Sequence, residues 1–178
     1  SGPAGKRLSG VPMGGEDRAL AAEGKTADGL SPILAILDET GQVRGSSGKE
    51  VDFIDAITTA QGAHEKPLLI VISTQAPTDA DLLSIWLDDA ERSEDPKIVS
   101  HVYSAPDDCD LQDEKAWKAA NPAMGLFRQK EDVVEQAAQA ERMPSSENTF
   151  RVLTLNQRVN MVAPFVSPSV WKKGNGAP

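Results

Sequence analysis

Two adjacent acids, Asp38 and Glu39, stand directly after the apolar run 33–37. If that run forms a strand, the end of the strand holds both carboxylates in place. The first could help to position Mg²⁺ beside the phosphates of a nucleotide, and the second could orient or deprotonate an attacking water molecule. The pair therefore indicates nucleotide hydrolysis, although Asp-Glu also occurs as a plain strand exit with solvated acids.

A polar triplet, Ser73-Thr74-Gln75, follows a second apolar run, 68–72, and begins 35 residues after Asp38. Its hydroxyl and amide groups could sense a terminal phosphate through hydrogen bonds that are made or lost. The alternative is an ordinary polar turn, in which the hydroxyls cap backbone groups. Taken alone, the triplet favours the polar turn.

The elements that must position these residues are predicted from the spacing of apolar side chains. Short apolar runs between turn residues indicate buried strands, and apolar residues at helical spacing indicate helices. We expect strands at 33–37, 68–72 and 98–104, with 19–22 as a further short one, and helices at 50–60, after a cap at Thr78 or Asp79, at 114–120, at 130–142 and at 146–159. Residues 1–18 are expected to form a loop.

This alternation of strands and helices predicts an α/β fold with a largely parallel sheet and flanking helices. Ligands of such sheets bind beyond the carboxyl ends of the strands, where both polar segments are expected. The side chains expected to face the core of this fold are Val51, Phe53, Ile54, Ile57, Leu82, Leu83, Ile85, Trp86, Leu87, Val133, Val134, Ala137, Ala140, Phe150, Leu153 and Leu155.

Composition limits the partners and the setting. The 178 residues carry 18 Lys and Arg against 27 Asp and Glu, a net charge of -9, so this chain offers few basic groups to displace counterions from nucleic acid. Its single cysteine, Cys109, allows no internal disulfide and fits a reducing, cytoplasmic setting. No apolar run approaches the ~20 residues needed to span a membrane.

Five segments resemble phage terminase large subunits. The stretch 25–39 is similar to the Walker B region of that family, and 69–76 is similar to its coupling motif. The segments that match characteristic later parts of the family are WKAANPAMG at 117–125 and FRVLTLNQ at 150–157. The segment FVSPSVW at 165–171 resembles the entry to the family's nuclease domain. The resemblance runs in order over about residues 19–171, which makes it far more specific than either polar segment alone.

The resemblance implies a P-loop NTPase-like fold and an ATP-driven motor that packages phage DNA into procapsids and cuts concatemeric DNA. By carry-over, Asp38 would hold Mg²⁺ and Glu39 would be the catalytic carboxylate. Ser73, Thr74 and Gln75 would bind at the nucleotide and couple its hydrolysis to movement. The implied partners are double-stranded DNA, the small terminase subunit, the portal protein and the procapsid, with a homo-oligomer during packaging, in the host cell cytoplasm.

The family's phosphate-binding loop is expected upstream of this chain. Gly2-Pro3-Ala4-Gly5-Lys6-Arg7 does not replace it, because the pattern G-x-x-x-x-G-K-S/T needs more widely spaced glycines and a hydroxyl where Arg7 stands. Residues 1–160 are thus interpreted as a partial ATPase domain, incomplete at its N-terminal side and inactive alone, and 161–178 as a linker toward a nuclease domain. A helicase-like hydrolase of the same broad fold and a non-catalytic interaction module remain the alternatives.

The other candidate residues favour structural roles. Asp107, Asp108, Asp110, Asp113 and Glu114 could bind a divalent metal, but they lack the spacing of a calcium loop and favour a solvated acidic loop. The remaining candidates are read as packing anchors, surface residues or ion pairs, although the two arginines could also face a neighbouring subunit: Cys109, His64, His101, Trp86, Trp117, Trp171, Arg151 and Arg158.

Overall fold

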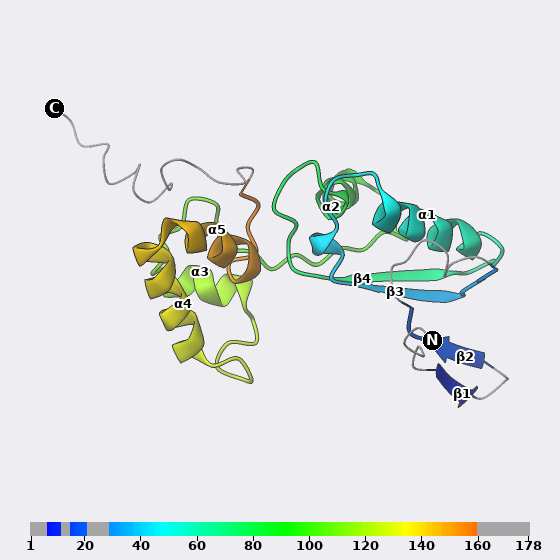
Figure 1. Cartoon of the computed structure of the whole chain (residues 1–178), viewed down its shortest axis with the longest axis horizontal. Coiled ribbons are helices and arrows are strands. Elements are labelled where there is room, and N and C mark those ends of the chain that lie inside the picture. The colour runs from blue at the N-terminus through cyan, green and yellow to red at the C-terminus, as the bar shows by residue number, and fades with distance from the viewer. Residues whose placement is uncertain (1–6, 12–14, 21–28, 160–178) are drawn as a thin grey trace. The chain divides into compact units, whose positions relative to one another are not determined.

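The computed structural model describes residues 7–11, 15–20 and 29–159. The chain divides into two compact units, the first made of residues 1–37 with 46–70, and the second of residues 38–45 with 71–178. The boundary crosses two strands, so each strand starts in the first unit and ends in the second. Each unit is described by itself below (Figure 1).

An antiparallel hairpin lies where the sequence predicted a loop. Strand β1 (Arg7–Val11) pairs with β2 (Gly15–Arg18), and the register shifts between Ser9 and Val11. The pairing is made by backbone groups, and the segment has no alternation of apolar and polar residues that would have predicted it. Ala19 and Leu20 do not continue the strand, and residues 21–22 lie outside the described part of the chain.

Strands β3 (Leu34–Asp38) and β4 (Leu68–Ile72) form a two-stranded parallel sheet. The N–H of Leu68 donates to the carbonyl of Ile33 at 2.8 Å, and the N–H of Glu39 donates to that of Ile72 at 2.9 Å. The bonded residues advance together along both strands, which is the parallel arrangement. Both strands lie within a residue of their predicted bounds, and the predicted parallel sheet is confirmed for this pair.

One face of this sheet is bare. Successive strand residues point to opposite faces, and the register places Leu68 beside Leu34 and Ile72 beside Asp38. Leu34 is 48% exposed and Ile36 57%, whereas Ala35 between them is buried. Leu68 and Ile72, on the same face, are 54% and 58% exposed. The prediction that both strands are buried on both faces was therefore wrong for this face within the described structure.

Helix α1 (Lys49–Gln61) accompanies the sheet and matches its prediction closely (Figure 1). Its four predicted core residues are all buried. At its end the Gln61 amide donates to the carbonyl of Leu68 at 2.9 Å, and the hydroxyl of Ser31 meets the carbonyl of Ala60 at 3.5 Å. The helix is thus fixed to the start of the strands by its own last turn.

In the second unit, helix α2 (Leu82–Arg92) has Asp81 at its N-cap position, so the predicted cap at Thr78 or Asp79 was wrong. The Asp81 carboxylate does not cap the helix. It accepts from the N–H of Gly45 at 2.7 Å and from both the N–H and the hydroxyl of Thr78. Burial alone would raise the pKa of Asp81, but these donors hold it below its usual value. Leu82 and Leu83 are buried as predicted, whereas Ile85 is 41% exposed.

Residues 98–104, all within the described part of the chain, form no strand, so the predicted third strand was wrong. Val99 is 73% exposed and Tyr103 55%. The pattern supplies β-prone apolar residues, but a strand also needs a neighbour that satisfies its backbone groups. The residues that the structure describes supply none for this segment.

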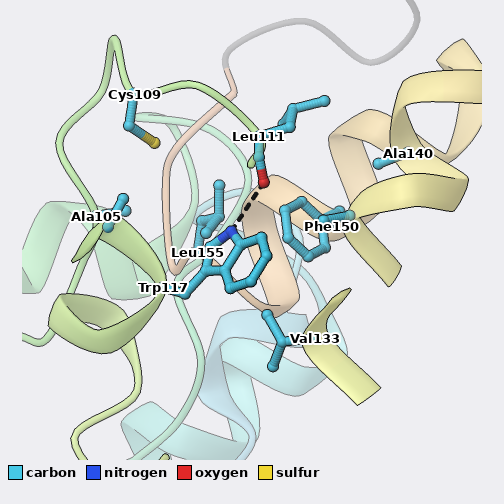
Figure 2. Close-up of a cluster of buried hydrophobic side chains, with 10 residues drawn as sticks. Ala105, Cys109, Leu111, Trp117, Val133, Ala140, Phe150 and Leu155 are labelled. Atoms are coloured by element: carbon cyan, nitrogen blue, oxygen red, sulfur yellow. Dashed lines mark hydrogen bonds between the residues drawn. The ribbon is translucent and has the colours of Figure 1, made fainter. Parts of the chain in front are cut away.

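Three helices pack into the main apolar cluster of the second unit, and they are α3 (Glu114–Ala120), α4 (Lys130–Arg142) and α5 (Pro144–Leu153). Trp117 lies at its centre, 1% exposed, with its indole N–H donating to the carbonyl of Leu111 at 2.8 Å (Figure 2). The other members are Ala105, Cys109, Leu111, Ala116, Val133, Ala137, Ala140, Phe150 and Leu155. Of the predicted core residues on α4 and α5, Val134 and Leu153 are exposed instead, at 40% and 45%.

Hydrogen bonds of Asn121 link the carboxyl-terminal ends of α3 and α5. The Asn121 amide donates to the carbonyls of Trp117 at 2.8 Å and Thr154 at 2.9 Å, and Arg128 donates to its oxygen. Helix α5 stops at Leu153, short of the predicted 159, because the chain turns at Asn156, whose φ of 55° is left-handed. No helix among the described residues is long and apolar enough to cross a membrane.

Candidate functional site

Asp38 and Glu39 lie at the carboxyl end of β3, as predicted. Asp38 is the last strand residue, and Glu39 leaves the strand with a φ of 58° and a ψ of 30°, in the left-handed region. That conformation is uncommon for a residue with a β-carbon. The hydrogen bond from its N–H to Ile72 fixes it beside the end of β4. Both acids are exposed, so their carboxylates are accessible to a ligand.

The short helix η1 (Thr40–Gln42) brings this turn against the polar triplet. The N–H of Gly41 donates to Oγ of Ser73 at 2.7 Å, and that hydroxyl donates to the carbonyl of Thr74, also at 2.7 Å. The two predicted segments therefore meet at one edge of the sheet, which confirms the expected geometry. Their chemical roles stay predictions.

Gly41 is the residue that permits this contact, and the sequence reasoning missed it. A β-carbon built there would lie 2.2 Å from the carbonyl oxygen of Thr74 and 2.9 Å from Oγ of Ser73. Both separations are far below van der Waals contact, and the nearer atom belongs to the backbone. Its signal in the sequence is a glycine two positions after the acid pair.

Replacing Gly41 with alanine is expected to lower the free energy of unfolding by about 1–3 kcal/mol, because an inserted methyl group must push the backbone apart. Gly62→Ala is the matched control, since its β-carbon would meet the nearest atom, the Thr59 carbonyl, at 3.1 Å. Urea unfolding of both variants measures the difference. Equal stability of the two variants would contradict the close contact.

The side-chain polar groups of the other two residues of the triplet are largely buried. Oγ1 of Thr74 is buried and has no hydrogen-bond partner among the described residues. Gln75 is 7% exposed, and its side-chain oxygen accepts from the N–H of Ala76 at 3.1 Å. Its backbone N–H donates to Oδ1 of Asn156 at 2.6 Å. In this structure the triplet is therefore linked to Gly41 and to Asn156, and Asn156 is a second residue that the sequence reasoning missed.

The acidic loop is built from local turns. Oδ1 of Asp110 accepts from the N–H of Gln112, and Oδ1 of Asp113 accepts from the N–H of Lys115 as the cap of α3. No group of three or more His, Cys, Asp or Glu side chains within the described ranges could hold a metal ion. Burial raises the pKa of the Cys109 thiol, which keeps it in the unreactive protonated form.

The two arginines differ. Arg158 forms the predicted surface ion pairs, at 2.7 Å to Asp88 and 3.2 Å to Asp79, and its hydrogen bond to Asp88 holds the pKa of that carboxyl below its usual value. Arg151 is instead buried, so the surface prediction was wrong for it. It donates to Glu147 at 2.9 Å and to Gln157 at 3.0 Å, and such a buried pair needs these further hydrogen bonds to be stable.

The remaining candidates have structural surroundings. Nε2 of His64 lies 2.8 Å from the carbonyl of Ser31, and His101 is exposed. Trp117 is the packing anchor that was predicted, Trp86 is half-buried, and Trp171 lies outside the described residues. An open pocket of about 300 Å³ has Gln75 and Arg158 in its lining but neither Asp38 nor Glu39.

An α/β segment with two adjacent acids at a strand end occurs in a broad class of proteins. Comparison with known proteins narrows that class. No protein-family model matches the chain. The chain is 66% identical over 170 residues, 96% of its length, to the large terminase subunit of Enterobacteria phage HK97. The crystal structure of the HK97 large terminase matches with a TM-score of 0.82, again over 96% of this chain.

The predicted resemblance to phage terminase large subunits is therefore confirmed. The chain spans about one third of the length of the relative, 33% of the curated sequence and 35% of the crystallised chain. At this identity and TM-score, the described structure has the fold of the corresponding segment of that terminase.

Proposed function

We propose that this chain is part of a large terminase subunit, the ATP-driven motor that packages phage DNA into procapsids and cuts concatemeric DNA. One observation carries the proposal: the Asp38-Glu39 pair at the end of β3 is joined, through Gly41, to Ser73 at the end of β4. The 66% identity to a large terminase over 96% of the chain supports it.

In this proposal Asp38 would hold Mg²⁺, which supplies positive charge beside the phosphates of ATP. Glu39 would orient the attacking water molecule and accept its proton. The exposure of both side chains fits these roles, because a buried carboxylate could not reach a nucleotide from outside. The polar triplet Ser73-Thr74-Gln75 would couple hydrolysis at this site to movement through the hydrogen bonds that it makes with backbone groups and with Asn156.

The bare sheet face supports a P-loop type of domain that is completed by further chain. Parallel sheets are normally covered on both faces, and Leu34, Ile36, Leu68 and Ile72 are about half exposed here. The segment that covers them would include the phosphate-binding loop, so this chain alone would lack a cradle for the phosphates. Residues 1–160 would then be a partial ATPase domain, with 161–178 leading to the nuclease domain.

The partners follow from the same proposal. They are double-stranded DNA, the small terminase subunit, the portal protein and the procapsid, with several copies of the large subunit acting together in the host cell cytoplasm. A net charge of -9 makes this segment a poor DNA-binding surface. Basic groups elsewhere in the subunit would hold the DNA.

The experiment compares the isolated chain with the full-length subunit in a steady-state ATPase assay with and without Mg²⁺ and double-stranded DNA. We expect magnesium-dependent turnover, stimulated by DNA and accompanied by DNA cleavage, in the full-length subunit only. Turnover without cleavage would favour another P-loop-type hydrolase such as a helicase, and the absence of nucleotide binding would favour a non-catalytic module. Turnover by the isolated chain would overturn the proposed division of the site.

A further inference from the structure

Asn156 joins three segments that lie far apart in the sequence. Its Oδ1 accepts from the N–H of Gln75 at 2.6 Å, and its Nδ2 donates to the carbonyl of Tyr103 at 2.8 Å. The residue follows α5 with a left-handed φ of 55° and is half-buried. Both groups of the carboxamide are therefore used, one as acceptor and one as donor.

The backbone on either side holds Asn156 in place. Leu155 is fully buried in the helical cluster, and the N–H of Gln157 donates to the carbonyl of Arg151 at 2.8 Å. Two residues later, the N–H of Val159 donates to the carbonyl of Pro77 at 2.8 Å. A side chain on so constrained a backbone has few positions to choose from, so it can act as a fixed acceptor for Gln75.

The segment 73–75 is consequently held at two points. Gly41 binds it through Ser73, and Asn156 binds it through Gln75. The first contact belongs to the turn that carries Glu39, and the second belongs to the helical cluster. Any shift of the segment must break or stretch one of these bonds.

We propose that Asn156 is a positioning residue for the nucleotide site: it fixes Gln75, and through it Ser73, so that the turn bearing Glu39 keeps its place. This inference rests on the proposed function. In this role Asn156 links the turn that carries Glu39 to the helical cluster, so that a movement of either one is transmitted to the other. Asn156 itself touches neither nucleotide nor water in this role.

A simpler explanation is that asparagine stands here only because it tolerates a left-handed backbone. Asn156→Gly separates the two explanations, because glycine adopts this conformation freely but has no side chain. Asn156→Asp retains an acceptor for Gln75 while losing the donor to Tyr103. Thr154→Val is the matched control, because Thr154 lies two residues before Asn156. This variant removes the 2.7 Å hydrogen bond from the Thr154 hydroxyl to Gln136 and leaves the segment 73–75 untouched.

The test uses the full-length subunit and two measurements. The first is hydrogen exchange of the peptide that contains Gln75, which we expect to be at least about tenfold faster in Asn156→Gly and unchanged in Thr154→Val, since a local hydrogen bond sets local protection. The second separates nucleotide affinity from turnover. In Asn156→Gly we expect kcat to fall about 10- to 100-fold, as for a misplaced catalytic group, with the Kd for Mg-ATP unchanged.

Asn156→Asp is expected to retain turnover within about threefold of wild type, because aspartate keeps the acceptor for the N–H of Gln75. An Asn156→Gly variant with wild-type exchange and wild-type kcat would overturn the inference and leave the proposed function intact. Equal losses in Asn156→Gly and Thr154→Val would also overturn it, since they would indicate general destabilisation. If the wild-type subunit turns over no ATP, the proposed function fails, and the catalytic part of this inference fails with it.

Discussion

Glu39→Gln is expected to lower the kcat for ATP in the full-length subunit by about 10²–10⁴-fold, the range lost when a positioned general base is removed. Glutamine is similar to glutamate in size and has the same backbone preferences at a left-handed position, but its amide cannot act as a base. Binding of Mg-ATP should be retained, because Asp38 and the phosphate-binding loop would hold the nucleotide. A steady-state assay together with equilibrium nucleotide binding measures both quantities.

Glu50→Gln supplies the control for this variant. Glu50 lies in the first turn of α1 and is exposed, and Glu50→Gln makes the same chemical change outside both the acid pair and the polar triplet. Its kcat should equal that of the wild type. If Glu39→Gln keeps more than about a tenth of the wild-type turnover, a gap of only about 1.4 kcal/mol in the barrier, the assignment of Glu39 as the base is wrong.

Trp117→Ala is expected to lower the free energy of unfolding by about 3–5 kcal/mol, the usual cost of removing a large buried aromatic side chain. Trp117 is 1% exposed and lies in one cluster with buried side chains of α4 and α5 (Figure 2). Trp117→Phe retains most of the apolar volume but strands the carbonyl of Leu111, so we expect an intermediate loss of about 1–3 kcal/mol. Chemical denaturation followed by circular dichroism measures each value without depending on tryptophan fluorescence.

Val134→Ala on the exposed side of α4 is the control, and it should cost no more than about 0.5 kcal/mol. Val134 and Val133 are neighbours in sequence, but the first is 40% exposed and the second fully buried. A Trp117→Ala variant as stable as Val134→Ala would show that the cluster is not the core of its unit.

Local signals made several elements predictable. The bounds of α3 and α4 were predicted without error, because α3 starts at the Asp113 cap and ends before Asn121-Pro122, and because α4 has a clear apolar stripe. Both strands of the sheet were predicted for a similar reason, since each is a short apolar run between turn residues. The meeting of Asp38-Glu39 with Ser73 followed from the parallel order of those strands.

What failed depends on partners distant in the sequence. An apolar run does not say which of its faces is covered, so the prediction of a strand buried on both faces was wrong at Leu34 and Ile36. The segment 98–104 has strand-forming residues but finds no strand neighbour in the described structure. Val134 fits the helical stripe as well as Val133 does, and only the packing of the whole cluster distinguishes the buried valine from the exposed one.

The site was predicted in outline only. Acidic and hydroxyl residues can be identified as candidates from their residue type alone. Gly41, by contrast, matters because it has no side chain, and Asn156 matters because it contacts a residue 81 positions away. Neither property is visible in local spacing. Positive φ at Glu39 likewise follows from the hydrogen bond to Ile72 and not from the preference of glutamate.

The helical cluster around Trp117 has a consequence for folding. All of its members lie between residues 105 and 155, so the cluster is built from one continuous stretch of chain. The sheet pairs residues of an earlier stretch, as in the bond between Leu68 and Ile33. Because neither set of contacts uses residues of the other, the strands should be able to separate while the cluster stays folded, and hydrogen exchange should then report two different opening free energies.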